Sequence, residues 1–421
     1  MRSPKQYIAA SGFSSAWFGS GFAFFLIAAV LGCLLRFYWI GDFTGIPYKH
    51  LLHAHSHVAL LGWAFTLLSG GLLFTMIPLE KAERRPYRLV LGLIIVSSIG
   101  MTIGFCLQGY GLVSISFCAL HLIGGYLFSR LFLRDLSSLP ASPQRKLAKW
   151  AVLWMLISTL GLWAVGPVTA TLGKLHPLYF ASIQFFLHLQ LNAWLTFGML
   201  ALLFGWLARR GHQVSLPKSY FVGLQLSVML TYALSVSWST PLKIVFLFNS
   251  IGVLLQLAVF GLIAYRLLPA ISAVDVRKSY LKKLLWFGLA SLAAKIIVQS
   301  LVAIPAVAEV SYTIRNFVVG FIHLTMIGSI SLTLIAILIS EGLLPTAKVA
   351  VTGYFLLLIA FVSTEILLFG QGLLMWIGLG FLPNYYTIIF GCSLLFPLGL
   401  GLAMTGFQGK TAFEKSPSIH S

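Results

Sequence analysis

Residues 51–63 read Leu-Leu-His-Ala-His-Ser-His-Val-Ala-Leu-Leu-Gly-Trp and place three histidines inside a strongly apolar segment. An imidazole in a membrane interior is energetically costly unless a partner binds it. This stretch therefore predicts a binding site carried by a membrane-spanning helix.

The composition of the whole chain is that of a polytopic membrane protein. Of its 421 residues, 59% are hydrophobic and only 9% are charged, and apolar stretches recur from one end to the other. The net charge of +19 comes from Lys and Arg in short loops between these stretches, not from a basic soluble domain, which excludes a nucleic-acid-binding protein. The four cysteines lie in apolar segments without CxxC spacing, which excludes a disulfide framework and a zinc knuckle.

Twelve segments are apolar and long enough to cross a bilayer as helices. We expect an all-α polytopic membrane protein with one domain over residues 1–421, a membrane-embedded core at 16–410 and short tails. The longest polar connections, 134–148 and 269–283, leave no room for a soluble domain. The expected spans are 17–40, 51–78, 89–108, 111–133, 149–171, 177–207, 219–239, 243–268, 284–307, 312–340, 349–371 and 384–406.

Lys and Arg are concentrated in alternate loops and at the two ends of the chain. Because basic loops stay on the cytoplasmic side of a membrane, both termini are expected in the cytoplasm. We expect the chain to lie in a bacterial cytoplasmic (inner) membrane.

Under this topology the even-numbered spans that carry histidine all run from outside to inside. His57, His121, His188 and His323 then lie at similar depths in the outer half of their spans. Ligands that converge on one cofactor must share a depth, so the even-numbered spans are expected to hold the site.

The histidine spacing in the second span assigns its side chains to two faces. His53 and His57 are four residues apart and share a helix face, whereas His55 points away from them. One helix can therefore serve two sites. For His53, hydrogen bonding to loop carbonyls and headgroups is an equal alternative.

Other polar residues inside the spans allow either a functional or a packing role. His188 and Asn192 share a face in the sixth span, where His188 either binds a ligand or packs. His121 has no polar companion, which favours packing. Glu365 is expected to make an interhelical hydrogen bond, with a proton relay as the alternative, and Lys295 needs a partner that the sequence does not identify.

Glycine follows two of these histidines at the same distance. Gly62 lies five residues after His57, and Gly328 five residues after His323. A flat macrocycle lying against a helix requires such a loss of side-chain bulk, although helix packing uses glycine too.

The stretch from His55 to Trp63 resembles the haem-ligating helix of the large subunits of haem-copper oxidases and nitric oxide reductases, especially the cbb3-type oxidases. The twelve-span plan is similar to that superfamily as well. The resemblance implies that His57 and His323 bind a haem b, with His55 in the same cofactor-binding motif. It places His188 at the sixth-span copper position of the family.

The chain departs from this family at the oxygen-reducing centre. Phe321 stands where the family has the histidine of the high-spin haem, and residues 219–239 contain no histidine, although the family has a copper-binding pair there. The resemblance is therefore to a divergent member of subunit I. If His53, His55 or His188 bind a second metal, their imidazole ligands would suit copper or non-haem iron.

Two imidazoles on one haem leave no position for substrate and suit one-electron transfer. We expect a b-type haem protein in respiratory or nitric-oxide-linked redox chemistry, an oxidoreductase if it turns over a substrate. Its partners would be a quinol or cytochrome donor and respiratory-complex subunits. Arg36, Lys49, Arg315 and Trp63 are candidates to bind the haem propionates. The alternatives are a twelve-helix secondary transporter and a non-catalytic haem sensor or assembly factor.

Overall fold

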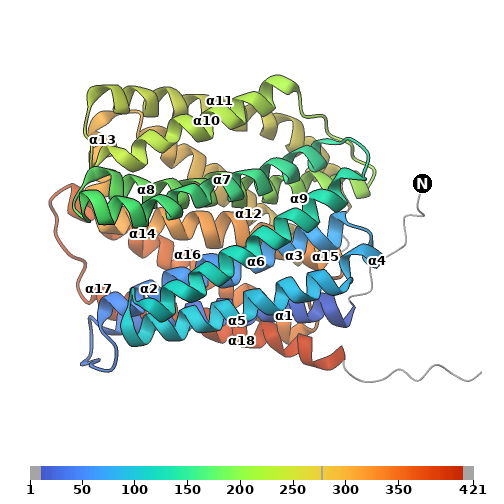
Figure 1. Cartoon of the computed structure of the whole chain (residues 1–421), viewed down its shortest axis with the longest axis horizontal. Coiled ribbons are helices and arrows are strands. Elements are labelled where there is room, and N and C mark those ends of the chain that lie inside the picture. Colours follow the sequence, from blue (N-terminus) through green and yellow to red (C-terminus); the bar gives the residue numbers. More distant parts are fainter. Residues whose placement is uncertain (1–10, 276–277, 411–421) are drawn as a thin grey trace, which may run out of the picture.

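The computed structural model describes residues 11–275 and 278–410, which form helices joined by loops (Figure 1). Twelve of these helical segments are long and apolar enough to span a membrane, which confirms the all-α twelve-span prediction. The protein is therefore an integral membrane protein. Both ends of the chain, used in predicting its orientation, lie outside the described residues.

The spans follow one another along the chain with short connections. The first six are α1 (Gly12–Phe37), α2 to α3 (Tyr48–Met76), α5 (Arg85–Gln108), α6 (Leu112–Ser137), α7 (Pro143–Leu172) and α8 to α9 (Pro177–Arg209). The next six are α10 (Lys218–Ser237), α11 (Lys243–Ala273), α12 (Ser279–Leu301), α14 to α15 (Arg315–Ser340), α16 (Lys348–Trp376) and α17 to η4 (Tyr385–Phe407). Two short helices, α4 (Leu79–Ala82) and α13 (Pro305–Thr313), lie between spans.

The ninth span differs from the expected segment 284–307. Helix α12 ends at Leu301, and Pro305 begins the separate helix α13. Proline lacks the N–H that an interior helical position must donate, but it fits the first turn of a new helix. The apolar run therefore continues across a break that hydropathy alone does not reveal.

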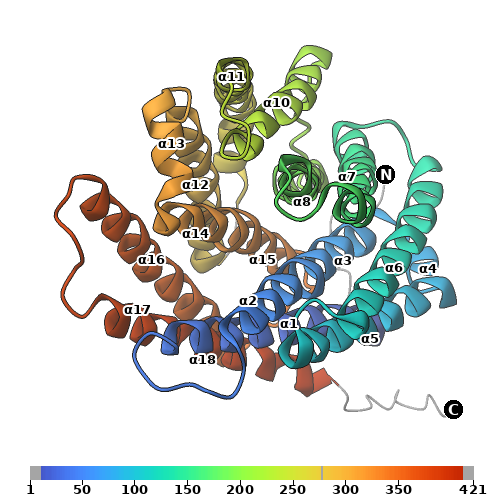
Figure 2. The same cartoon turned by 60° about the vertical axis from the view of Figure 1, so that its left-hand side comes forward.

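Three spans form the centre of the bundle: Tyr48–Met76, Pro177–Arg209 and Arg315–Ser340. In each, 89% of the most apolar stretch is buried, whereas the other nine spans reach 33–50%. Figure 2 shows the other helices arranged around these three. The most apolar stretch of each of these spans is therefore enclosed by other helices.

Each central span is interrupted by a π-helical segment that begins just after a histidine. The segments are η1 (Val58–Ala64) after His57, η2 (Gln190–Leu195) after His188 and η3 (Leu324–Ser331) after His323. A π-turn shifts the hydrogen-bonding register and often marks a functional position. The same local irregularity thus recurs in the spans that carry the predicted site residues.

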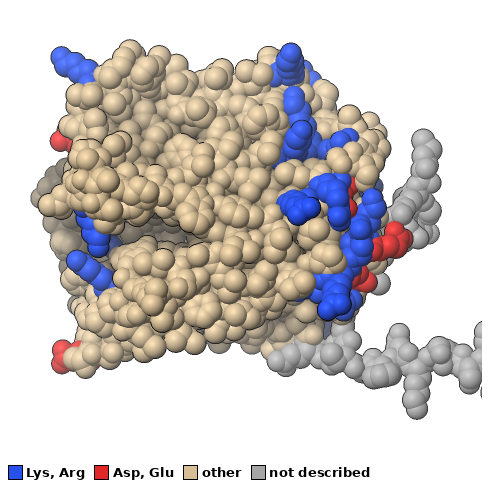
Figure 3. All heavy atoms as spheres, viewed as in Figure 1, with Lys and Arg blue, Asp and Glu red and all other residues tan. Residues whose placement is uncertain are grey.

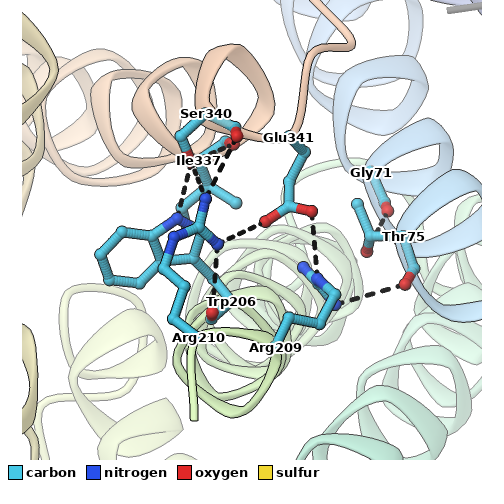
Figure 4. A network of polar contacts seen from close by, with 8 residues as sticks. All are labelled: Gly71, Thr75, Trp206, Arg209, Arg210, Ile337, Ser340 and Glu341. Atoms are coloured by element: carbon cyan, nitrogen blue, oxygen red, sulfur yellow. Dashed lines mark hydrogen bonds and ion pairs between the residues drawn. The ribbon is translucent and has the colours of Figure 1, made fainter. Parts of the chain in front are cut away.

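An ionic network joins the three central spans at one end of the bundle (Figure 4). Glu341, just after α15, accepts hydrogen bonds from Arg209 Nε at 3.1 Å and from Arg210 Nη1 at 2.7 Å, both at the end of α9. Arg209 Nη1 also donates to the Thr75 carbonyl of α3 at 3.3 Å. Lys and Arg side chains are concentrated at this same end in Figure 3.

Candidate functional site

His55 is held by the first span in a geometry suited to binding a ligand. Its Nδ1 donates to the Ala28 carbonyl of α1 at 2.8 Å. Gly32 lies against the ring, where an added Cβ would be 3.0 Å from His55 Cε1. With the proton on Nδ1, Nε2 keeps its lone pair and has no hydrogen-bond partner among the described residues. Metal-binding histidines commonly show this arrangement, with one ring nitrogen fixed by a carbonyl.

His323 ends α14, and within the described part of the chain neither of its ring nitrogens has a hydrogen-bond partner; Nδ1 is fully buried. Arg36 and His55 are the ionisable side chains near His323. A buried polar atom without a partner costs about 1–3 kcal/mol. The imidazole therefore has the capacity to bind a group that sits between the second and tenth spans.

Arg36 provides positive charge beside these two histidines. Its Nη1 donates to the Ile389 carbonyl of α17 at 3.2 Å and also contacts the Ser393 hydroxyl. Trp63, another residue predicted to contact propionates, stacks on Phe25 with ring centroids 3.6 Å apart. Its buried Nε1 has no hydrogen-bond partner among the described residues. Arg36 is thus fixed where an anionic group near His323 would be stabilised.

His57 and His53 occupy the opposite face of α2, as their spacing predicts. His57 Nδ1 lies 2.9 Å from the His53 carbonyl, and its Nε2 lies 3.3 Å from the Tyr110 hydroxyl. The His57 ring also packs 4.2 Å from Phe105 of α5, centroid to centroid. Burial raises the pKa of Tyr110, which keeps this hydroxyl protonated and able to donate. His57 therefore faces α5, not α1.

His188 makes hydrogen bonds with both ring nitrogens. Nε2 donates to the Val228 carbonyl of α10 at 2.8 Å, and Nδ1 lies 3.3 Å from Asn192 Nδ2. Asn192 Oδ1 in turn accepts from Lys295 Nζ at 2.7 Å. A metal at His188 would have to displace one of these partners.

The residues expected to bind a second metal lie on different helix faces and in different spans. No group of three or more His, Cys, Asp or Glu within the described ranges is arranged to hold a metal ion. His53 and His55 lie on opposite faces of α2, and His188 belongs to the sixth span. His121, for which packing was favoured, donates from Nε2 to the Leu61 carbonyl at 3.0 Å, inside η1.

Two features were not predicted from the sequence. Lys295 finds its partner in Asn192, a pairing between spans that no local pattern signals. The interhelical hydrogen bond expected for Glu365 is wrong, because neither carboxylate oxygen has a partner among the described residues. Instead, Glu365 lines a groove between α12, η3 and α16.

Comparison with known proteins shows which solved structure has a similar fold. No family model matches this sequence, and no curated protein matches it. A solved structure of a haem-copper terminal oxidase dimer is similar, with a TM-score of 0.65 and 12% sequence identity over 97% of this chain and 85% of that chain. At this identity the likeness shows a shared fold.

Proposed function

We propose that this protein binds a b-type haem between α2 and α14 and transfers single electrons. His55 and His323 would hold the haem. The observation that carries the proposal is the state of these two histidines. His55 is fixed through Nδ1 and keeps Nε2 free, and His323, which lies near His55 and Arg36, lacks any hydrogen-bond partner in the described chain.

His57 was the ligand implied by the family resemblance, and the local geometry favours His55 instead. Both ring nitrogens of His57 have partners, His53 and Tyr110, and the ring packs on Phe105. His55 and His57 lie two residues apart and point to opposite sides, so only one of them can face His323.

The residues around the proposed site each have a definite role. The haem, when bound, supplies reversible one-electron chemistry. The Ala28 carbonyl orients His55 and strengthens its Nε2 as a donor of electrons to iron. Gly32 gives the imidazole room against α1, and Arg36 provides the positive charge that propionates require.

The shared fold and the site together support a distant relationship to subunit I of the haem-copper oxidases. The end of the bundle rich in Lys and Arg would face the cytoplasm of a bacterial inner membrane, because positive loops are retained there. The haem would then lie toward the outer side, beside the ends of α2 and α14 that carry few basic residues.

The test is the absorption spectrum and haem content of the purified full-length protein and its histidine variants. His55→Ala and His323→Ala should each abolish the low-spin spectrum, and His57→Ala should retain it. His212→Ala, in the loop between α9 and α10 and outside the proposed site, serves as the control.

Three outcomes would decide against the proposal or part of it. An unchanged low-spin spectrum in both His55→Ala and His323→Ala refutes the site. Loss in His57→Ala with retention in His55→Ala restores His57 as the ligand. A colourless, metal-free preparation from haem-replete cells would exclude haem binding and favour transport.

A further inference from the structure

A groove of about 430 Å³ runs along the exposed face of α5. Six residues of this one helix line it: Arg85, Arg88, Leu89, Gly92, Leu93 and Val96. Their spacing of three or four residues places them in one row, which covers about 16 Å of helix at 1.5 Å per residue. Leu89 and Val96 are 59% and 53% exposed on the surface that meets lipid in an integral membrane protein. The groove is therefore open to the bilayer.

The two ends of the groove differ in chemistry. Arg85 and Arg88 lie in the first turn of α5, whereas the apolar part of the lining continues toward the middle of the third span. This first turn belongs to the basic end of the bundle seen in Figure 3, because Arg209 of that end bonds the Thr75 carbonyl shortly before α5 begins. The groove thus offers positive charge at the membrane surface and apolar walls inside the membrane.

The cations of the groove have no anionic partner among the described residues. The Arg85 side chain makes no hydrogen bond or ion pair there, and Arg88 donates only through Nε, to the Glu83 carbonyl at 3.2 Å. The first turn of α5 holds no acidic side chain. The adjacent Arg84, by contrast, pairs with Asp135 at 3.4 Å. Arg85 and Arg88 therefore keep their donors for an anion from outside the described chain.

Gly92 opens the apolar part of the groove. Nothing lies within 4 Å of an added Cβ at this position, so no neighbouring helix requires a glycine here. Gly100 and Gly104 of the same helix are different, because each packs against α6, on Phe117 and Ser114. The missing side chain of Gly92 leaves a space along the helix that is continuous with the two arginines.

We propose that this groove binds an anionic phospholipid, with the phosphate on Arg85 and Arg88 and one acyl chain lying over Gly92. Guanidinium groups bind phosphate oxygens through paired, charge-assisted hydrogen bonds. Free phosphate would use the arginines alone, and the acyl chain of an uncharged lipid would use the apolar wall alone. A zwitterionic phospholipid brings a second cation to the basic end, which the two arginines disfavour. The inference does not rest on the proposed haem function.

The test is native mass spectrometry of the purified full-length protein in detergent, titrated with phosphatidylglycerol or with phosphatidylcholine. The wild-type protein should bind one phosphatidylglycerol with a preference of about tenfold or more, as expected for two basic residues near a membrane surface. The double variant Arg85→Gln with Arg88→Gln should lose this preference. Gly92→Leu should weaken binding of the lipid, because the new side chain fills the groove without clashing with the protein.

Two matched controls separate the groove from general effects. Lys282→Gln with Lys283→Gln removes the same charge from exposed positions at the start of α12. Gly261→Leu adds the same side chain at an exposed position of α11, where nothing lies within 4 Å of an added Cβ. Both should keep the affinity and the preference of the wild-type protein.

Four results would overturn the site. Equal binding of the two lipids by the wild-type protein excludes the headgroup contact. Equal loss in the two charge variants assigns the effect to net charge, and equal loss in the two leucine variants excludes the groove. Displacement of phosphatidylglycerol by the same concentration of glycerol 3-phosphate would make the arginines a site for soluble phosphate. Thermal unfolding checks the fold of each variant; if the double arginine variant unfolds, Arg85→Gln alone replaces it.

Discussion

Lys295 Nζ on α12 donates a hydrogen bond to Asn192 Oδ1 on η2 over 2.7 Å, and both side chains are buried. No carboxylate of the described chain pairs with this ammonium group. The ring of Phe321, with its centroid 5.8 Å from Nζ, supplies the other favourable contact. The amide of Asn192 therefore joins the sixth and ninth spans and also orients His188.

We predict that Asn192→Ala lowers the free energy of unfolding by about 1–3 kcal/mol, because it leaves a buried cation without its acceptor. In a Lys295→Met background the same substitution should cost much less. Thermal unfolding of the four proteins of this cycle in nanodiscs provides the measurement, with Thr352→Ala, at an exposed position of α16, as the control. Equal costs in the two backgrounds would show that the hydrogen bond contributes nothing.

His188→Ala should keep the low-spin haem spectrum while lowering stability. Its ring bonds Val228 and Asn192, so its removal leaves a carbonyl and an amide unpaired, at about 1–3 kcal/mol. Absorption spectra and melting temperatures of the same preparation separate the two effects. If His188→Ala removed haem as completely as His323→Ala, the assignment of His188 outside the haem site would be wrong.

Gly32 is predicted to be essential for the position of His55. A Cβ at this position would lie 3.0 Å from His55 Cε1, tighter than ordinary van der Waals contact, so Gly32→Val should displace the imidazole and reduce haem content. Gly261→Val, at an exposed position of α11, is the matched control, because nothing lies within 4 Å of its added Cβ. Full haem content in Gly32→Val would exclude His55 as a ligand fixed against α1.

The spans and the opposing faces of α2 could be predicted from sequence, because both depend on local periodicity. The length of the apolar segments was enough to predict all twelve spans. The spacing of the histidines along a helix was enough to predict that His55 lies on the opposite face of α2 from His53 and His57. Only the break before Pro305 was missed, since the residues on both sides of it are apolar.

The choice between His55 and His57 could not be made from sequence. It depends on how α2 is rotated against its neighbours, and that rotation is set by packing partners far away in the chain, such as Ala28 and Phe105. The π-helical segments could not be predicted from the sequence either, because no residue pattern distinguishes them from α-helix. The Lys295 to Asn192 pairing spans 103 residues, and no local pattern signals contacts of that kind.

Glu341 should be important for holding the three central spans together. Its carboxylate, 9% exposed, accepts from both Arg209 and Arg210, so Glu341→Ala leaves two cations facing each other and should cost about 2–3 kcal/mol. Glu341→Gln should cost less, since it keeps one acceptor. Glu80→Ala, an exposed carboxylate outside the network, is the control in thermal unfolding. A melting temperature of Glu341→Ala equal to that of Glu80→Ala would show that the network is not stabilising.

The final prediction is that the protein does not reduce oxygen in the manner of a proton-pumping terminal oxidase. The resemblance implies that such enzymes need a five-coordinate haem beside a three-histidine copper. Here Phe321 replaces one ligand, residues 219–239 contain no histidine, and His188 already bonds Val228 and Asn192. We expect reversible one-electron redox cycling and nitric oxide binding with little oxygen uptake, measured with an oxygen electrode and a reduced quinol or cytochrome donor. Sustained cyanide-sensitive uptake by the isolated chain would contradict this and would imply that His53, His55 and His57 rebuild the missing centre.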